Sequence, residues 1–372
     1  MSVPFIDLKR FEDGFLDAWI AKVTELSRET RFIGGDEVNQ FEQNLAQDTG
    51  CRFALGCANG TDALQLALRG AGVGPGDVVL LPDFTFWATF EAIVNVGAQP
   101  VTVDISTTDL QMDFHLFQQA AEKHRPKAAM LVHLYGWGSA DLRRMRTYCR
   151  ENSILLIEDG AQAYGVTLDG VSIYKDADIS TISFYPAKVF GAAGDAGAVV
   201  TSSEEYNRRI RSLLNHGRSD HYSYEHVGWN SRLDSLQAAY MNLVRPHIEK
   251  RLESRRTIAR AYQNDFAGLE SVRCVAPPEG YLENGYLNVI LLESGEARGA
   301  LQESLKAKGI GAGIVYPEPI SIQQGAQSYI KDSIGGSVAL DVGRRVLSLP
   351  LYAYMTLEEQ QTVMQAVREV CR

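Results

Sequence analysis

The chain has 372 residues, of which 45% are hydrophobic and 22% are charged, and its formal net charge is −10. This composition is typical of a soluble globular protein, and the length favours two domains. The excess of acidic residues opposes non-specific binding to nucleic acid or to anionic lipid. No apolar run is long enough for a membrane span, and the N-terminal sequence lacks the pattern of a secretory signal, so we expect a cytoplasmic protein.

The cysteines are odd in number and widely scattered, and no CxxC pair occurs among them. Such spacing predicts neither a zinc site nor a redox couple, so we expect no metal site. No DNA-binding motif is present either. We expect reduced, mostly buried thiols at Cys51, Cys57, Cys149, Cys274 and Cys371.

In the first two thirds of the chain, short apolar or β-branched runs alternate with longer helical patterns. This alternation is typical of an α/β fold, a mostly parallel sheet flanked by helices. The seven strands that we predict span residues 53–57, 78–81, 101–105, 129–134, 154–158, 179–184 and 198–201. Helices are predicted between most of them, including 61–69 and 140–151.

The sequence pattern changes near residue 246. Residues 231–266 form one long helical pattern that is broken or kinked near Pro246. Beyond it we predict a strand at 287–292, a helix at 296–309, a strand at 314–316 and a terminal helix at 357–372. We therefore divide the chain into a large domain, 1–245, and a small α+β domain, 246–372, on which the N-terminal segment is a candidate to pack.

The residues whose side chains could take part in a reaction cluster in two segments, IEDGAQAYG and SFYPAKVFGAAGDAGAVV. Asp159 ends an apolar run, and ligands of open α/β sheets bind beyond the carboxyl ends of the strands. A carboxylate there can accept a hydrogen bond from a protonated pyridine nitrogen and keep that ring electron-withdrawing. The alternative is an ordinary turn or helix-capping aspartate.

Lys188 lies just before the glycine-rich GAAGDAG. In a desolvated pocket beside a cationic ring, a lysine loses its proton more easily, so its amine can attack an aldehyde and later shuttle protons. Glycines at 191, 194 and 197 let the backbone pass close to a flat ligand. A solvated surface lysine would look the same in isolation, and only the spacing from Asp159 favours the functional interpretation.

A phosphate site is indicated where the strand FALGC is followed by the helix TDALQLAL, at Asn59, Gly60 and Thr61. The N–H groups at a helix start lack intrahelical partners, and the helix dipole favours an anion there. A simple helix cap would have the same residues. Phe86, after the next strand, is a candidate to stack on a cofactor ring, with Trp87 as its competitor, although both residue types are also common in cores.

Together these motifs resemble the nucleotide-sugar aminotransferases of the pyridoxal phosphate fold-type I group, the DegT/StrS family. The likeness runs nearly end to end and includes, in order, FIDLKR, RFIGGDEVNQFEQNLA, NGTDALQLAL, GVGPGDVVLLPDFTFWAT, GAQPVTVDI, LVHLYGWGSADL, IEDGAQAYG, SFYPAKVFGAAGDAGAVV, NHGRS, GWNSRLDSLQAAY, VYPEPI and LSLPLY. The resemblance implies pyridoxal 5'-phosphate as the cofactor and a homodimer whose subunits share their active sites.

The resemblance also implies roles for single residues. Lys188 would hold the cofactor as an imine, and Asp159 would pair with its pyridine nitrogen. The remaining implied cofactor contacts are Gln162 near the ring, Phe86 on its face, Gly60, Thr61 and Ser183 at the phosphate, and Asn230 from the partner subunit. The candidates for substrate contact are Tyr185, Arg232, Tyr316 and Ser321.

Two stretches depart from the family pattern. Related enzymes commonly have a histidine after the YPxP turn, where this chain has Ser321. They often read LPMHP near the C-terminus, where this chain reads LPLYAYMT, with Tyr352 and Ala353. Both stretches resemble substrate-side elements, so the departures bear on which sugar is accepted.

The activity implied by the resemblance is a two-stage transamination. An amino acid, expected to be L-glutamate, gives its amino group to the cofactor, which then aminates a keto sugar, expected to be a nucleotide-linked 3- or 4-keto-(6-deoxy)hexose for amino-sugar biosynthesis. A cyclitol ketone as acceptor, or a non-catalytic cofactor-binding regulator, stays open. Relatives that dehydrate sugars have histidine at the position of Lys188, so the lysine argues against a lyase.

Overall fold

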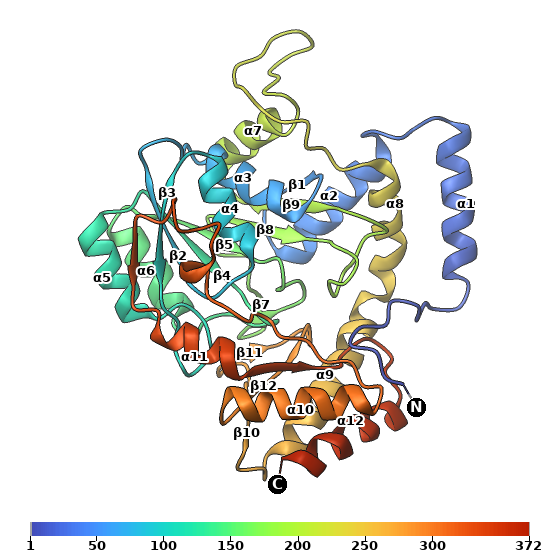
Figure 1. Cartoon of the computed structure of the whole chain (residues 1–372). Helices are drawn as coiled ribbons and strands as arrows, with labels where there is room; N and C mark the ends of the chain where they lie inside the picture. The colour runs from blue at the N-terminus through green and yellow to red at the C-terminus, as the bar shows by residue number, and fades with distance from the viewer. Residues whose placement is uncertain (1, 372) are drawn as a thin grey trace.

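The structure, a computed structural model, describes residues 2–371, and its centre is an eight-stranded sheet (Figure 1). The strand order is β1–β9–β8–β5–β4–β2–β3–β13. The strands are β1 Phe53–Cys57, β2 Val78–Pro82, β3 Gln99–Val103, β4 Ala128–Val132, β5 Leu155–Asp159, β8 Ile179–Ser183, β9 Gly197–Thr201 and β13 Asp332–Ile334. All neighbours pair in parallel except β9, which is antiparallel to both β8 and β1.

Helices cover both faces of this sheet. They are α2 Asp36–Thr49, α3 Gly60–Gly70, α4 Trp87–Asn95, α5 Phe114–His124, α6 Leu142–Glu151 and α7 Glu204–Leu213. Successive strand residues enter opposite cores, since Leu80 packs in one apolar cluster while Val79 and Leu81 pack in the other. A strand buried on both faces has a continuous apolar sequence, and each such side chain contributes about 1.5–3 kcal/mol on burial.

The seven predicted strands of the large sheet are present, with ends that differ by up to two residues. The expectation of a seven-stranded sheet is corrected by β13, which comes from the C-terminal part of the chain and adds an eighth strand beside β3. The predicted strand at 314–316 is wrong. Only an isolated bridge, between Gly313 and Ser348, lies next to it, and the carbonyl of Val315 accepts a hydrogen bond from the Tyr135 hydroxyl instead of joining a ladder.

The predicted long helical stretch is divided where Pro246 was expected to interrupt it. Its parts are α8 Ser235–Val244, the 3-10 turn η1 Arg245–His247 and α9 Ile248–Phe266. Beyond α9, an antiparallel sheet in the order β10–β12–β14 packs with helices around a separate apolar cluster. Its elements are β10 Val272–Cys274, β12 Asn288–Leu292, β14 Val346–Leu349, α10 Gly295–Ala307, α11 Ser337–Arg345 and α12 Leu357–Val370.

The N-terminal segment contacts this C-terminal unit. Val3 pairs in parallel with Ile310, its N–H donates to the carbonyl of Gly309, and its side chain is buried in the C-terminal apolar cluster. Cys371, which follows α12, is buried in the same cluster. We propose the boundary between the two domains at residues 245 and 246, within η1. A third, small sheet in the order β11–β6–β7 is formed by β6 Thr167–Leu168, β7 Val171–Ser172 and β11 Tyr281–Leu282.

Two parts of the chain project from this body. Helix α1, Phe15–Arg28, lies against α8 at one edge, and the loop of residues 214–234 between α7 and α8 extends beyond the sheet (Figure 1). Their exposed apolar side chains include Leu16, Ile20, Tyr222, Tyr224 and Val227. No described helix is long and apolar enough to cross a membrane. The five cysteines are unpaired, and all except the half-buried Cys274 are buried, as expected.

Candidate active site

The predicted lysine and aspartate lie at the ends of neighbouring parallel strands. Asp159 is the last residue of β5, and it pairs with Thr181 of β8. The chain then leaves β8 and turns back, so that Ala192 N–H donates to the carbonyl of Phe184 across 2.7 Å. Lys188 lies in this turn, at the carboxyl edge of the sheet where ligands of open α/β sheets bind.

The backbone of the lysine loop requires glycine at the point where it closes. A Cβ atom on Gly191 would lie 2.4 Å from the carbonyl oxygen of Pro186. Such a contact is impossible without moving the loop, because both atoms belong to or are fixed by backbone. Gly191 is thus required by the packing of the loop backbone, and the predicted close approach of this glycine to a flat ligand stays a prediction.

Asp159 is a buried carboxylate, 4% exposed, without an ion-pair partner among the described residues. One oxygen accepts from the Thr89 hydroxyl at 2.9 Å and the other from the Ala161 N–H at 3.1 Å. Burial raises the pKa of Asp159, while these hydrogen bonds and the charge of Lys188 act in the opposite direction. A carboxylate in such a position fits a ligand with a protonated ring nitrogen.

Lys188 contacts a tyrosine that the sequence did not single out. Its Nζ donates to the Tyr286 hydroxyl across 3.2 Å and lies 4.7 Å from the centre of the Tyr286 ring. Tyr286 comes from the segment just before β12, about a hundred residues along the chain. Nothing in the local sequence pattern indicates this contact, which depends on how the C-terminal unit packs on the sheet.

Gln162 is held in one orientation by two tyrosines. Its Oε1 accepts from the Tyr135 N–H at 2.6 Å, and its Nε2 donates to the Tyr316 hydroxyl at 3.3 Å. Burial raises the pKa of Tyr316, so its hydroxyl stays protonated. Phe86, just before α4, is 55% exposed, and its ring centre lies 6.0 Å from that of Tyr316. Trp87, its competitor in the sequence, packs on Phe90 instead.

The predicted phosphate residues meet at the start of α3. The side chain of Asn59 accepts from the Asp62 N–H at 2.8 Å, which leaves the N–H groups of Gly60 and Thr61 without partners inside the helix. A Cβ atom on Gly60 would lie 2.7 Å from the Cβ of Ser183. Ser183, at the end of β8, therefore adjoins the helix start, where backbone N–H groups and a hydroxyl can hold an anion together.

These residues fit pyridoxal 5'-phosphate. The buried Asp159 suits the ring nitrogen, Lys188 supplies an amine, and the start of α3 with Ser183 suits the phosphate.

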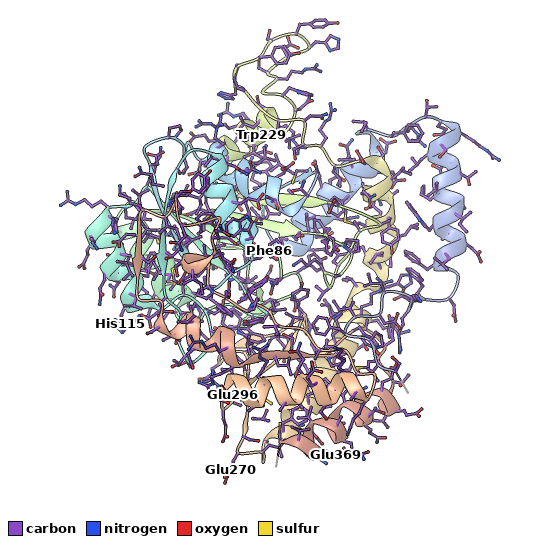
Figure 2. All side chains as sticks on the ribbon, viewed as in Figure 1. Phe86, His115, Trp229, Glu270, Glu296 and Glu369 are labelled. Carbon is purple, nitrogen blue, oxygen red and sulfur yellow. The ribbon has the colours of Figure 1, made fainter. Side chains whose placement is uncertain are left out.

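Asn230 and Arg232 flank Ser231, whose Oγ accepts a hydrogen bond from the Ala58 N–H at 3.3 Å, two residues before Gly60. Asn230 is exposed at the base of the projecting loop, near Trp229 (Figure 2), and forms an isolated bridge with Asn215. Arg232 donates to the side-chain oxygen of Asn215 at 3.1 Å. That Asn230 contacts the cofactor of a partner subunit stays a prediction.

The other predicted substrate residues differ in their surroundings. Tyr185 is 56% exposed beside the lysine loop. Ser321 is tied to the end of β2, because its hydroxyl and its N–H each donate to the Asp83 carboxylate at 2.7 Å. Tyr352, the second departure from the family pattern, is fully buried in the C-terminal cluster, with the Arg10 guanidinium stacked on its ring at 4.8 Å.

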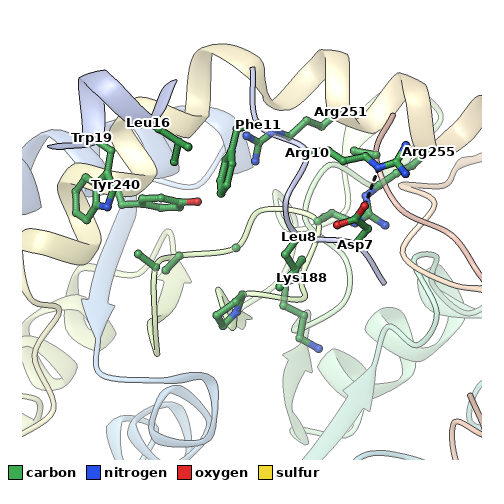
Figure 3. A pocket seen from close by; sticks show the side chains of 16 residues that line it. Asp7, Leu8, Arg10, Phe11, Leu16, Trp19, Lys188, Tyr240, Arg251 and Arg255 are labelled. Carbon is green, nitrogen blue, oxygen red and sulfur yellow. Dashed lines mark hydrogen bonds and ion pairs between the residues drawn. The ribbon is translucent and has the colours of Figure 1, made fainter. Parts of the chain in front are cut away.

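A cavity of about 400 Å³ adjoins Lys188 on the side of the N-terminal segment (Figure 3). Its walls are formed by residues 7–19, by the lysine loop and by α8 and α9. The polar and charged side chains in its lining are Asp7, Arg10, Lys188, Tyr240, Arg251 and Arg255.

Comparison with known proteins agrees with this geometry. The model of the DegT/DnrJ/EryC1/StrS aminotransferase family matches residues 17–368. The chain is 35% identical to UDP-N-acetyl-3-dehydro-α-D-glucosamine 3-aminotransferase of Acidithiobacillus ferrooxidans, over 99% of this chain and 97% of that protein. It is 33% identical to a pleiotropic regulatory protein of Geobacillus stearothermophilus, over 100% and 99% of the two chains. The crystal structure of Streptomyces venezuelae DesV in complex with a ketimine intermediate matches with a TM-score of 0.94 and 33% identity, over 99% of this chain and 98% of that one.

Proposed function

The chain belongs to the DegT/DnrJ/EryC1/StrS aminotransferase family, and we propose that it transfers the amino group of L-glutamate to the 3-keto carbon of a nucleotide-linked sugar. It is a pyridoxal-phosphate-dependent sugar aminotransferase. The observation that carries the proposal is the placement of the buried Asp159 and of Lys188 beyond neighbouring strand ends. The position of amination is taken from the name of the Acidithiobacillus relative.

When bound, pyridoxal phosphate supplies an electron sink, which is chemistry that no amino-acid side chain provides. The charge of Asp159 favours a proton on the pyridine nitrogen, which strengthens that electron sink. Lys188 would hold the cofactor in the resting enzyme, and its amine would serve as the base that moves the proton of the donor's Cα. One positioned base of this kind contributes about a hundredfold to ten-thousandfold.

The remaining residues fix the geometry. The N–H groups of Gly60 and Thr61 and the hydroxyl of Ser183 would hold the phosphate. Tyr286 orients the Nζ of Lys188 through the 3.2 Å hydrogen bond, and Gln162 is immobilised near the ring by its two tyrosine partners. Rigid placement lowers the barrier, because the reacting groups need not be ordered at each turnover.

We also propose a homodimer in which Asn230 of each subunit reaches the phosphate in the other. Asn230 is exposed and lies at the base of the loop of residues 214–234. That loop and α1 expose apolar side chains, among them Tyr222 and Val227, which are 82% and 85% exposed. Exposed apolar side chains grouped on projecting elements favour contact with another subunit.

The assignment of Lys188 is tested by the absorbance of the purified enzyme with pyridoxal phosphate, before and after L-glutamate is added. We expect a visible cofactor band that glutamate converts to the aminated form, and we expect Lys188→Ala to fold but to show no turnover. Turnover by Lys188→Ala at the wild-type rate would sink the assignment. The same holds if no cofactor band forms in the wild type.

A second function, a cofactor-binding regulator without catalysis, is favoured by the name of the Geobacillus relative. The same spectra separate the two functions, because a regulator would hold the cofactor and show no conversion with any amino acid. A cyclitol ketone as acceptor is distinguished only in the second half-reaction. There the aminated enzyme is offered a keto cyclitol or a 3-keto nucleotide sugar, and the sugar is expected to restore the original band.

A further inference from the structure

Arg255 is a buried guanidinium without a carboxylate partner. It lies on α9 and is 6% exposed. Its Nη1 donates to the carbonyls of Gly285 and Leu351, each at 3.3 Å, and its Nε has no hydrogen-bond partner among residues 2–371. Burial lowers the pKa of Arg255 to about 10. A buried charge is costly unless it is paired, so a partner outside the chain would stabilise this position.

The other arginines in the lining of the same cavity are paired. Arg10 binds Asp7 through its Nε at 2.9 Å, and Arg251 binds Glu12 at 2.6 Å. Because these guanidinium groups already have carboxylates, they offer little to a further anion. Within the described part of the cavity, the guanidinium left for a ligand is therefore that of Arg255.

The position of Arg255 relative to Lys188 means that an anion paired with Arg255 can take part in catalysis. Both residues line the cavity of about 400 Å³ (Figure 3). They are also connected through two successive residues, because Gly285 accepts from Arg255 and the Tyr286 hydroxyl accepts from Lys188. Both side chains therefore line one space, which matches a small molecule with an acid at one end and an amine at the other.

We propose that Arg255 binds a carboxylate of the amino donor in this cavity. This inference rests on the proposed function and deepens it. The volume is at the lower end of the range for small-molecule sites and suits an amino acid of five carbons better than a nucleotide sugar. The Asp7 carboxylate in the lining also opposes a diphosphate, whereas one planar guanidinium is matched to one carboxylate.

Binding of an unreactive dicarboxylate to the holoenzyme tests the inference without relying on turnover. Glutarate has the acid groups of glutamate but no amine, and its binding is followed by titration calorimetry. We expect wild-type enzyme to bind glutarate and not the neutral glutaramide. Arg255→Met should weaken glutarate binding by roughly 10- to 100-fold, the usual contribution of a hydrogen bond to a charged group.

Two further variants serve as comparisons. Arg251→Met removes an equally charged side chain from the same lining, and it should leave glutarate affinity close to wild type because Arg251 already binds Glu12. Arg255→Lys keeps the charge and should recover part of the affinity. If Arg255→Met fails to fold, as judged by circular dichroism, the comparison of Arg255→Lys with wild type remains, and unchanged glutarate affinity in Arg255→Lys would overturn the proposal.

A carboxylate can also come from a uronate acceptor, so glucuronate is titrated in parallel. Loss of glucuronate binding with glutarate binding intact in the Arg255 variants would overturn the donor assignment, as would wild-type enzyme that binds neither acid. These outcomes are read from binding and are therefore distinguishable from a failure of the proposed function. That function fails only if wild-type enzyme is not aminated by any amino acid, which is read from the cofactor spectrum.

Discussion

At Asp159 the negative charge, more than the shape of the side chain, should matter for catalysis. Asp159→Asn keeps an oxygen that can accept from Thr89 or Ala161 but loses the charge that favours a protonated ring nitrogen. We expect the variant to bind pyridoxal phosphate and to be aminated by glutamate roughly 10²–10³-fold more slowly, as when one preorganised electrostatic group is removed. Stopped-flow absorbance in single turnover measures this rate.

Thr89→Val is the matched comparison for that prediction. It removes one hydrogen bond to Asp159 and leaves the charge, so the rate should fall by about tenfold at most. Equal rates for Asp159→Asn and wild type would show that the carboxylate is only structural.

Glu283 should make the stability of the fold depend on pH. It is 7% exposed, and burial raises its pKa to about 7 from 4.5. The folded state thus binds a proton more tightly than the unfolded state, so the contribution of Glu283 to stability is present below pH 4.5 and is lost as the pH rises to 7.

Glu283→Gln should therefore raise the free energy of unfolding at pH 8, by on the order of 1–3 kcal/mol, and the gain should vanish near pH 4.5. Denaturant unfolding of both proteins between pH 4.5 and pH 8 measures the difference. The exposed Glu303→Gln controls for the loss of one charge. A gain that grows towards acidic pH would contradict the assignment.

Among the structural elements, the start of α3 is the most sensitive to added volume. In Gly60→Ala the new Cβ would lie 2.7 Å from the Cβ of Ser183, so the helix start must move away from the end of β8. We expect the affinity for pyridoxal phosphate to fall roughly 5- to 100-fold, in line with the cost of overpacking. Absorbance titration of the apoenzyme measures it. Gly299→Ala in α10 has open space around its Cβ and should bind the cofactor as tightly as wild type.

The strands of the large sheet were predictable because they are apolar, short and bounded by turn residues, as in the run from Val78 to Pro82. Residues 314–316 have the same apolar and aromatic character, but here Val315 and Tyr316 bond to the side chains of Tyr135 and Gln162. An apolar pattern indicates that residues are buried but does not indicate their hydrogen-bond partners. A loop that packs against the site is therefore predicted as a strand.

The short strand β13, by contrast, is present in the structure but was not predicted from the sequence. Its residues are only partly buried, and its pairing with β3 joins segments more than two hundred positions apart. No local pattern reveals such a partner. The candidate site divides in the same way, since Asp159 and Lys188 lie in recognisable motifs. Tyr286 and Arg255 reach the site only through tertiary packing.

At the scale of the whole molecule, the proposed homodimer assigns one cofactor contact to the other subunit. The cofactor-binding edge of the sheet, the cavity beside it and the start of α3 belong to one chain. Asn230 is exposed at the base of a projecting loop, where it forms an isolated bridge with Asn215. A pair of chains that exchange these loops would complete both sites.

Exchange of Asn230 between subunits predicts that two inactive variants restore each other. Lys188→Ala lacks the amine, and Asn230→Asp places a negative charge where the phosphate of the partner should bind. When the two are refolded together, half of the dimers are mixed, and each mixed dimer has one intact site, so activity should recover to about a quarter of wild type. Steady-state transamination measures the recovery, with each variant refolded alone as the control. Mixed dimers that form but stay inactive would show that Asn230 belongs to the site of its own chain. That result would contradict the proposal that the subunits share their active sites.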